Sequence, residues 1–233
     1  GPLNFGLDLQ QQNVTYALKE DFENGLGDFT NQSPTVYTVS TTTSASAPSG
    51  SKYINFVGDG YYSNGLEATF TPAQAERFSY HVRENSFYSS QAGAVIIGGP
   101  NLYYYYNGIF ASMFTGSYLR LYYNNGSYNT YYSHTITLGQ WYNIEIENID
   151  YTAQTYDVLL DGVVLVSGAH FMNSLTTQLS EIQVFNYYNG NISLDNFVVG
   201  AETIANSITF LPSTGIVSPG SSVNVNVSVD ASD

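Results

Sequence analysis

Short runs of alternating apolar and polar residues, separated by Gly, Asn, Asp or Pro, recur along the chain. A period of two places successive side chains on opposite faces of a β-strand, and the separating residues favour tight turns. Residues 119–123 and 156–160 are the clearest cases, because each run meets an Asn-Gly or Asp-Gly step and a second β-type run follows. At least ten such runs and almost no helical pattern predict an all-β fold, a two-sheet antiparallel β-sandwich.

The composition supports this fold and excludes several partners. The 233 residues include 22 Tyr and 13 Phe, which favour strands, and 43% of the chain is hydrophobic, enough for a substantial core. The net charge is −14, and nucleic acids and anionic membranes need a basic surface, so neither is an expected partner. No apolar run approaches the roughly 20 residues that span a bilayer, so no membrane insertion is expected. The absence of cysteine rules out disulfides and thiolate chemistry.

The character of the sequence changes near residue 200. Residues 207–215 and 223–229 form two β-type runs joined by a Pro/Gly segment, and two strands cannot bury a core by themselves. We therefore predict a main β-domain over residues 10–203 and the truncated start of a second β-domain over residues 206–233. The second part resembles the opening of the immunoglobulin-like repeats of large exported bacterial proteins. This resemblance implies a secreted or cell-surface bacterial protein whose partners include neighbouring domains of the same chain.

Several motifs in the main domain resemble a known superfamily. Trp141 opens an alternating run, and the Asp161-Gly162 hairpin follows after a short loop. This spacing resembles the laminin-G-like branch of the concanavalin A-like lectin/glucanase superfamily. The segments 21–23 and 194–198 resemble the bracketing strands of related jelly-roll modules, several of which bind carbohydrate. The resemblance covers about residues 14–200 and implies a concanavalin A-like jelly roll, a fold that carries lectins, adhesion modules and hydrolases alike.

The middle of the chain is rich in tyrosine and poor in charge. No acid lies between Glu84 and Glu145, Arg120 is the only charged residue in this window, and twelve of the 22 tyrosines fall inside it. A tyrosine ring can stack on the C–H face of a pyranose while its hydroxyl bonds to the sugar. The window therefore favours a sugar ligand, although tyrosines are also ordinary strand residues that can serve sheet packing alone.

Alternation selects the candidate binding residues in this window. If Leu119 and Leu121 face the core, Tyr123 also points inward, whereas Arg120 and Tyr122 point outward. We expect the outward tyrosines to line a shallow neutral surface. The predicted ligand-binding residues are Tyr104, Tyr106, Tyr122, Tyr131 and Arg120.

A cluster of carboxylates raises the possibility of catalysis. Glu145, Glu147 and Asp150 resemble the Glu-x-Asp-x-x-Glu strand of laminarinase-type hydrolases, in which two carboxyl groups about 5–5.5 Å apart act on the scissile bond. Two positions differ from that motif, and the location directly after Trp141 favours a laminin-G-like strand with Glu145 and Glu147 facing solvent. We therefore predict no enzyme activity and assign no catalytic residue.

The expected function is that of a non-catalytic carbohydrate-binding module that recognises a glycan or polysaccharide. One alternative is a structural or adhesive spacer that contacts proteins or cell surfaces. Another is a polysaccharide-degrading glycoside hydrolase. An exposed apolar patch would favour the spacer, whereas a polar surface lined with tyrosines would favour carbohydrate binding.

The acidic residues near the start of the main domain suggest a cation site. Residues 20–28 hold four carboxylates, a repulsive arrangement unless it is compensated. The resemblance to jelly-roll modules implies a structural Ca²⁺ where an early Glu, an Asp of the last strand and loop carbonyls meet. The corresponding residues here are Asp21, Glu23, Ser49, Lys52 and Asp195. The alternative is a solvated acidic turn relieved by Lys19 and Lys52.

Overall fold

The computed structural model describes residues 16–58, 65–86, 91–186 and 190–200 with their side chains, and four further strands by their backbone. The chain divides into two compact units, residues 16–201, and residues 1–15 with 202–233. In the smaller unit, β1 (Leu3–Gly6) pairs antiparallel with β18 (Thr214–Val217), and β17 (Ser207–Leu211) with β19 (Asn226–Asp230). An immunoglobulin-like character for residues 206–233 stays a prediction.

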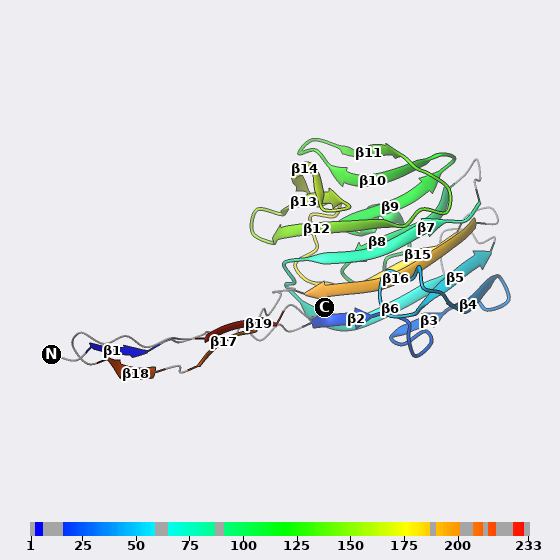
Figure 1. Ribbon diagram of the computed structural model, residues 1–233. Coiled ribbons are helices and arrows are strands. Elements are labelled where there is room, and N and C mark those ends of the chain that lie inside the picture. The colour runs from blue at the N-terminus through cyan, green and yellow to red at the C-terminus, as the bar shows by residue number, and fades with distance from the viewer. Residues whose placement is uncertain are drawn as a thin grey trace. The chain divides into compact units, whose positions relative to one another are not determined.

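The larger unit is almost entirely antiparallel β-structure (Figure 1). Sheet I contains, in spatial order, β3 (Phe29–Asn31), β6 (Leu66–Ala73), β15 (Leu179–Phe185), β8 (Gln91–Gly98), β9 (Phe110–Thr115), β10 (Tyr118–Asn124) and β11 (Asn129–Thr135). Sheet II contains β14 (Val163–His170), β13 (Thr155–Leu160), β12 (Tyr142–Asp150), β7 (Phe78–Glu84), β16 (Gly190–Gly200), β5 (Lys52–Gly58) and β4 (Tyr37–Thr43), and β2 (Tyr16–Glu20) also pairs with β16. A short contact between β10 and β14 joins the sheets at one edge. The predicted β-sandwich of jelly-roll type is confirmed.

Aromatic side chains fill the space between the sheets. The rings of Tyr80 on β7 and Phe197 on β16 stack at 5.1 Å, and both side chains are buried. The hydroxyl of Tyr80 shares a hydrogen bond with the hydroxyl of Ser112 on β9, so a polar contact crosses the core from sheet II to sheet I. Residues 94–97 of β8 are buried throughout, as their continuous apolar pattern predicts.

Both hairpins that the sequence predicts are present. β13 and β14 are joined by Asp161 and Gly162, whose φ angles are 50° and 75°. Positive φ at both residues gives a tight turn whose own twist matches the right-handed twist of the paired strands. β10 pairs with β11 from Tyr118 opposite Thr135 to Asn124 opposite Asn129. Among the described residues, no helix is long and apolar enough to cross a membrane.

One buried amide bonds to strands of both sheets. Asn186, which follows β15 of sheet I, accepts a hydrogen bond from the backbone N–H of Gly93 on β8 at 2.8 Å. Its amide nitrogen donates to the carbonyls of Phe56 at 2.9 Å and Gly190 at 3.0 Å, both in sheet II. Its own carbonyl accepts a hydrogen bond from the hydroxyl of Tyr37 on β4. A side chain at Gly190 would collide with the Asn186 amide, so this close approach requires glycine.

Replacing Asn186 by Leu should therefore strongly destabilise the larger unit. The change leaves one buried N–H and two carbonyls without their partner, and each such group costs about 1–3 kcal/mol. We expect the free energy of unfolding to fall by about 3 kcal/mol or more in urea titrations followed by fluorescence. Asn129→Ala, in the β10–β11 hairpin, is the control and should cost about 0.5 kcal/mol or less. Equal effects of the two substitutions would contradict the proposed importance of Asn186.

Candidate functional site

Tyrosine and arginine side chains gather on the outer face of sheet I. Leu119 and Leu121 of β10 are fully buried in the core, so alternation turns Arg120 and Tyr122 to the opposite face. Across the sheet, Arg120 lies opposite Ser133 on β11 and Met113 on β9. Tyr122 lies opposite Tyr131 on β11 and Ala111 on β9 in the same registers.

The connection from β8 to β9 brings further tyrosines to this face. Its short 3₁₀ turn η1 (Tyr105–Asn107) packs on β8 and β9. Both carboxylate oxygens of Glu181 on β15 hold this connection, accepting the backbone N–H groups of Asn101 at 2.8 Å and Leu102 at 3.2 Å. The Asn173 side chain donates to the carbonyl of Asn107 at 2.9 Å. These anchors fix the tyrosine-rich turn against the sheet.

The rings form a continuous cluster, which we call the tyrosine surface and define as Tyr104, Tyr105, Tyr106, Tyr122 and Tyr131 with Arg120. Ring centroids lie 4.8 Å apart for Tyr104 and Tyr105, and 4.0 Å for Tyr105 and Tyr106. Tyr122 follows at 5.1 Å from Tyr105, and Tyr131 at 5.3 Å from Tyr122. The Arg120 guanidinium lies 4.6 Å from the centre of the Tyr131 ring. The structure thus brings together all five residues that the sequence predicts for the ligand site.

Their exposure differs from the prediction at one position. Tyr104, Tyr106 and Tyr131 are exposed, at 37%, 41% and 45% of their surface. Tyr122 points outward but is only 5% exposed, because the rings of Tyr105 and Tyr131 pack over it. The expectation that Tyr122 would offer a free stacking surface is therefore wrong. Alternation gives the face of a strand residue, but it cannot show what a distant turn places over that face.

Sequence reasoning also missed Tyr105. It is half-buried and links the exposed rings of η1 to Tyr122. The run of four tyrosines at residues 103–106 was the available signal, but period-two alternation does not apply inside a 3₁₀ turn. Its position could be found only from the packing of the turn on the sheet.

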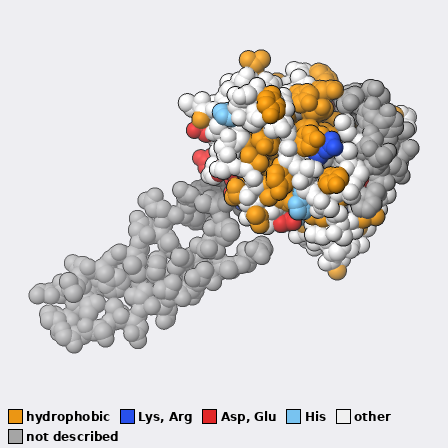
Figure 2. All heavy atoms as spheres, turned by 90° about the horizontal axis from the view of Figure 1, so that it is seen from above, with side chains coloured by type: hydrophobic (Ala, Val, Ile, Leu, Met, Phe, Trp, Pro, Cys, Tyr) orange, Lys and Arg blue, Asp and Glu red, His pale blue; other side chains and the backbone are white. Residues whose placement is uncertain are grey.

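The tyrosine surface carries protonated hydroxyls and a positive charge. Burial raises the pKa of Tyr105, and burial raises that of Tyr122 while the Arg120 guanidinium opposes the shift. Strands β9, β10 and β11 contain no acidic residue. Figure 2, which looks onto the side of β10, β11 and β14, shows apolar and aromatic groups spread over this region with a cationic group among them. The site can therefore offer ring faces and hydrogen-bond donors to a ligand.

Two of the three carboxylates expected at a cation site, Glu23 and Asp195, accept N–H groups of one loop, residues 49–52. The Glu23 carboxylate accepts the backbone N–H groups of Ser51, at 2.6 Å, and Lys52, and also the Ser51 hydroxyl at 2.9 Å. Asp195 on β16 accepts the backbone N–H of Ser49 at 2.9 Å. Asp21 instead accepts the backbone N–H of Glu23. The Lys52 ammonium donates to the Glu23 carbonyl, so Lys52 holds this turn in place.

Backbone N–H groups relieve part of the acidic repulsion without a metal. Glu20 accepts the N–H groups of Phe22 at 2.7 Å and Asp28 at 3.0 Å. The hydrogen bond from Ser51 is the main cause that lowers the pKa of Glu23. Within the described ranges, no three acidic or histidine side chains converge on one point.

Asp195 is a buried carboxylate whose charge is only partly compensated. Its side chain is fully buried, and burial raises its pKa to about 7. The charges of Asp21 and Glu23 raise this pKa further, while hydrogen bonds from Ser49 and Asn196 act in the opposite direction. A buried carboxylate with this pKa is partly protonated at neutral pH unless a cation compensates it.

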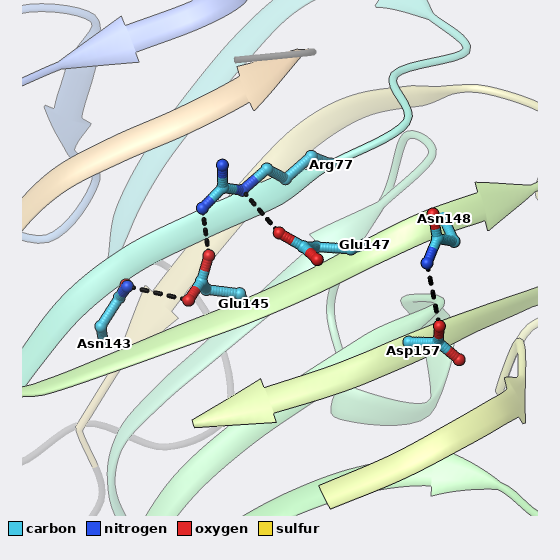
Figure 3. Close-up of polar contacts among 6 residues, drawn as sticks. All are labelled: Arg77, Asn143, Glu145, Glu147, Asn148 and Asp157. Atoms are coloured by element: carbon cyan, nitrogen blue, oxygen red, sulfur yellow. Dashed lines mark hydrogen bonds and ion pairs between the residues drawn. The ribbon is translucent and has the colours of Figure 1, made fainter. Parts of the chain in front are cut away.

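Two of the three carboxylates considered for catalysis, Glu145 and Glu147, contact the same arginine (Figure 3). Glu145 is buried, and its oxygens bond to Arg77 and, at 3.0 Å, to the Asn143 amide. Glu147 is half-buried and lies 3.4 Å from the same Arg77. The expectation that Glu145 faces solvent is therefore wrong, because Arg77 packs over β12 and covers it.

A bulge separates Asp150 from the two glutamates. The register of β12 on β13 shifts between Glu147 and Asp150, and Asn148 has a φ of 53°. Asp150 is exposed and accepts the backbone N–H groups of Thr152 and Ala153 at 2.7 and 2.9 Å. Residues 145 and 150 are an odd number of positions apart, so simple alternation would direct their side chains to opposite faces of a strand, and the shifted register lies between them.

Comparison with known proteins identifies the fold. No family model matches this chain, and no curated protein matches it in sequence. The chain is similar to the endo-β-1,4-glucuronan lyase of the fungus Trichoderma reesei, with a TM-score of 0.54, 13% identity, and coverage of 82% of this chain and 97% of the lyase. It is also similar to the T. cruzi calreticulin globular domain, with a TM-score of 0.55, 16% identity, and coverage of 80% and 88%. The cellulose-induced protein Cip1 has a TM-score of 0.53 and 16% identity, with coverage of 78% and 96%. At these identities, the likeness shows the sandwich fold alone.

The raised pKa of Asp195 predicts a pH-dependent stability in the metal-free protein. The folded state binds this proton more tightly than the unfolded state, so its contribution to stability falls as the pH rises from about 4 to 7 and is constant above. Asp195→Asn should therefore leave stability near pH 4 little changed and raise it at pH 8 by on the order of 3–4 kcal/mol. Urea unfolding in EDTA at pH 4.5, 6 and 8 measures the difference.

Asp157→Asn is the matched control for this experiment. Hydrogen bonds from Ser167, Asn148 and Gly168 lower the pKa of Asp157, so its stabilising effect is present at neutral pH and is lost as the pH falls through the folded-state pKa. At pH 8 the free energy of unfolding should therefore be higher than that of the wild type for Asp195→Asn and lower for Asp157→Asn. Parallel pH profiles for the wild type and Asp195→Asn would show that Asp195 is not the destabilising group.

Proposed function

We propose that residues 16–201 form a non-catalytic module that binds a polysaccharide or glycan on the tyrosine surface. The observation that carries this proposal is the continuous row of rings from Tyr104 to Tyr131, on strands and a connection that contain no acidic residue. Exposed ring faces can stack on the C–H faces of sugar rings, and their hydroxyls can bond to sugar hydroxyls. The exposed groups at this site carry hydroxyls, which suits a sugar better than the apolar contact of a spacer.

The buried members of the cluster would make this surface rigid. Tyr122 and Tyr105 pack beneath the exposed rings, and Glu181 anchors the connection that carries η1. Side chains that are already ordered lose less conformational entropy when a ligand binds. The proposed site therefore binds by pre-organised stacking.

The contacts of Glu145, Glu147 and Asp150 support a binding role over hydrolysis. Arg77 bonds to both Glu145 and Glu147, and Asp150 caps the turn that follows β12. A retaining hydrolase needs two carboxyl groups about 5–5.5 Å apart and available to the substrate. The name of one structural neighbour, a glucuronan lyase, is consistent with a polysaccharide ligand at the level of ligand class. We further propose that the module acts as a secreted or cell-surface protein, where polysaccharides are accessible.

Removing single exposed rings should weaken binding without unfolding the protein. Tyr106→Ala and Tyr131→Ala should each reduce affinity tenfold or more, because an aromatic contact at an interface can contribute about 2 kcal/mol. Tyr128→Ala removes a more exposed tyrosine outside the tyrosine surface and serves as the control. A glycan array supplies the ligand, and isothermal titration calorimetry measures its affinity for each variant. Unchanged affinity in both cluster variants would place binding elsewhere.

We also propose that Ca²⁺ binds at loop 49–52 between Glu23 and Asp195. Both carboxylates reach this loop, and the buried charge of Asp195 is only partly compensated by N–H groups. A ligand that binds only the folded state stabilises it by about 2.7 kcal/mol at 100 times its dissociation constant. Millimolar CaCl₂ should therefore raise the melting temperature relative to EDTA, and Glu23→Gln should reduce this rise. Identical melting temperatures with and without Ca²⁺ would refute the proposal.

A further inference from the structure

We propose that the sugar bound at the tyrosine surface carries a carboxylate, as in a uronic acid, and that Arg120 binds this group. The inference rests on the proposed function and specifies the chemical class of its ligand. It follows from the residues that surround Arg120 and from its contact with Tyr131.

Arg120 has no acidic neighbour on the strands around it. Its cross-strand partners are Ser133 and Met113, and strands β8 to β11 contain no acid. The connection at residues 99–109 contains none either. Among the described residues, Arg120 forms no ion pair, whereas Arg77 contacts both Glu145 and Glu147. A cation held apart from acids in a chain of net charge −14 is suited to an acid supplied by a ligand.

The guanidinium of Arg120 also has unused hydrogen-bonding capacity. Its Nε atom is enclosed without a hydrogen-bond partner, and the interaction with Tyr122 engages only part of its donor set. Arg83 on β7 shows the contrast, because it donates to Tyr53, Ser193 and Asn85 at 2.9–3.1 Å. A guanidinium with N–H groups that lack acceptors gains more free energy from a new acceptor than a guanidinium whose N–H groups are already hydrogen-bonded.

The geometry at Arg120 favours a planar acceptor beside an aromatic contact. The guanidinium lies over the Tyr131 ring, and a planar guanidinium can stack on a ring while it donates to acceptors in its own plane. Because Nε is enclosed, a carboxylate would accept two parallel N–H groups from the two Nη atoms, which fixes its orientation as well as its charge. Tyr131 is 45% exposed, so a sugar ring could contact it while its carboxylate reaches Arg120. A uronate supplies both groups in one residue.

Titration of uronate oligosaccharides tests this inference directly. The probes are hexamers of galacturonate, glucuronate and mannuronate, each paired with its carboxyl-reduced, neutral counterpart. We expect at least one uronate to bind and carboxyl reduction to weaken it tenfold or more. Because the protein is strongly acidic, a polyanion is not attracted by the overall charge, so binding would report a local site.

Substitutions then assign the effect to Arg120. Arg120→Gln should weaken uronate binding tenfold or more and should reduce the ratio of the affinity for the uronate to the affinity for its neutral counterpart toward one. Arg120→Lys keeps the charge but loses the planar fork, so it should restore only part of the affinity. Arg83→Gln, a ring-stacked arginine on sheet II, is the control and should leave affinity unchanged. If Arg120→Gln fails to fold, as judged by its melting temperature, the carboxyl-reduction comparison on the wild type decides the question.

The outcomes separate this inference from the proposed function. Equal binding of neutral polysaccharides such as xylan by the wild type and Arg120→Gln, with no preference for uronates, retains the proposed function and overturns the role of Arg120. Binding of a sulfated polysaccharide but of no uronate would overturn the carboxylate assignment. Binding of no polysaccharide at all would overturn both.

Discussion

The buried side chain of Asn186 links backbone groups that neither sheet can satisfy by itself. The strands of sheets I and II pair within their own sheets, but Gly93, Phe56 and Gly190 direct polar backbone groups toward the same buried point. An unpartnered polar group there would oppose the hydrophobic packing that holds the sandwich together. One amide offers both a donor and an acceptor, so it can bond to both sheets at once. The close approach at Gly190 shows how little space remains around it.

The tyrosine surface depends on the sandwich because sheet I and the connection after β8 position its residues. Sheet I directs its leucines into the core, which leaves Arg120 and Tyr122 on the opposite face. The connection after β8 then lays η1 over that face, and Glu181 fixes the connection by accepting two backbone N–H groups. Residues from a turn and two strands thus share one surface. The same packing that buries Tyr122 supports the more exposed Tyr131 beside it.

Acidic residues in this protein are compensated in three different ways. Glu145 and Glu147 share Arg77, whereas Glu23 receives backbone N–H groups from loop 49–52. Asp195 also receives N–H groups, but its complete burial outweighs them and keeps its pKa near 7. With five basic residues against 19 acids, most carboxylates must rely on N–H donors, water or an external cation. Arg120, by contrast, has no carboxylate on the strands beside it.

The sequence alone determined the all-β class, the hairpins at 125–128 and 161–162, and the face on which Arg120 lies, because these follow from local alternation and turn chemistry. It also selected tyrosines that lie close together in the structure, since all belong to one acid-free segment, although it missed Tyr105. Only the tertiary structure decided which of them are accessible: Tyr122 is covered by residues of η1 and β11, and Glu145 is covered by Arg77. Local patterns fix the direction of a side chain relative to its own strand. Exposure, ion pairing and pKa depend on atoms that other segments bring from a distance, and no local pattern encodes them.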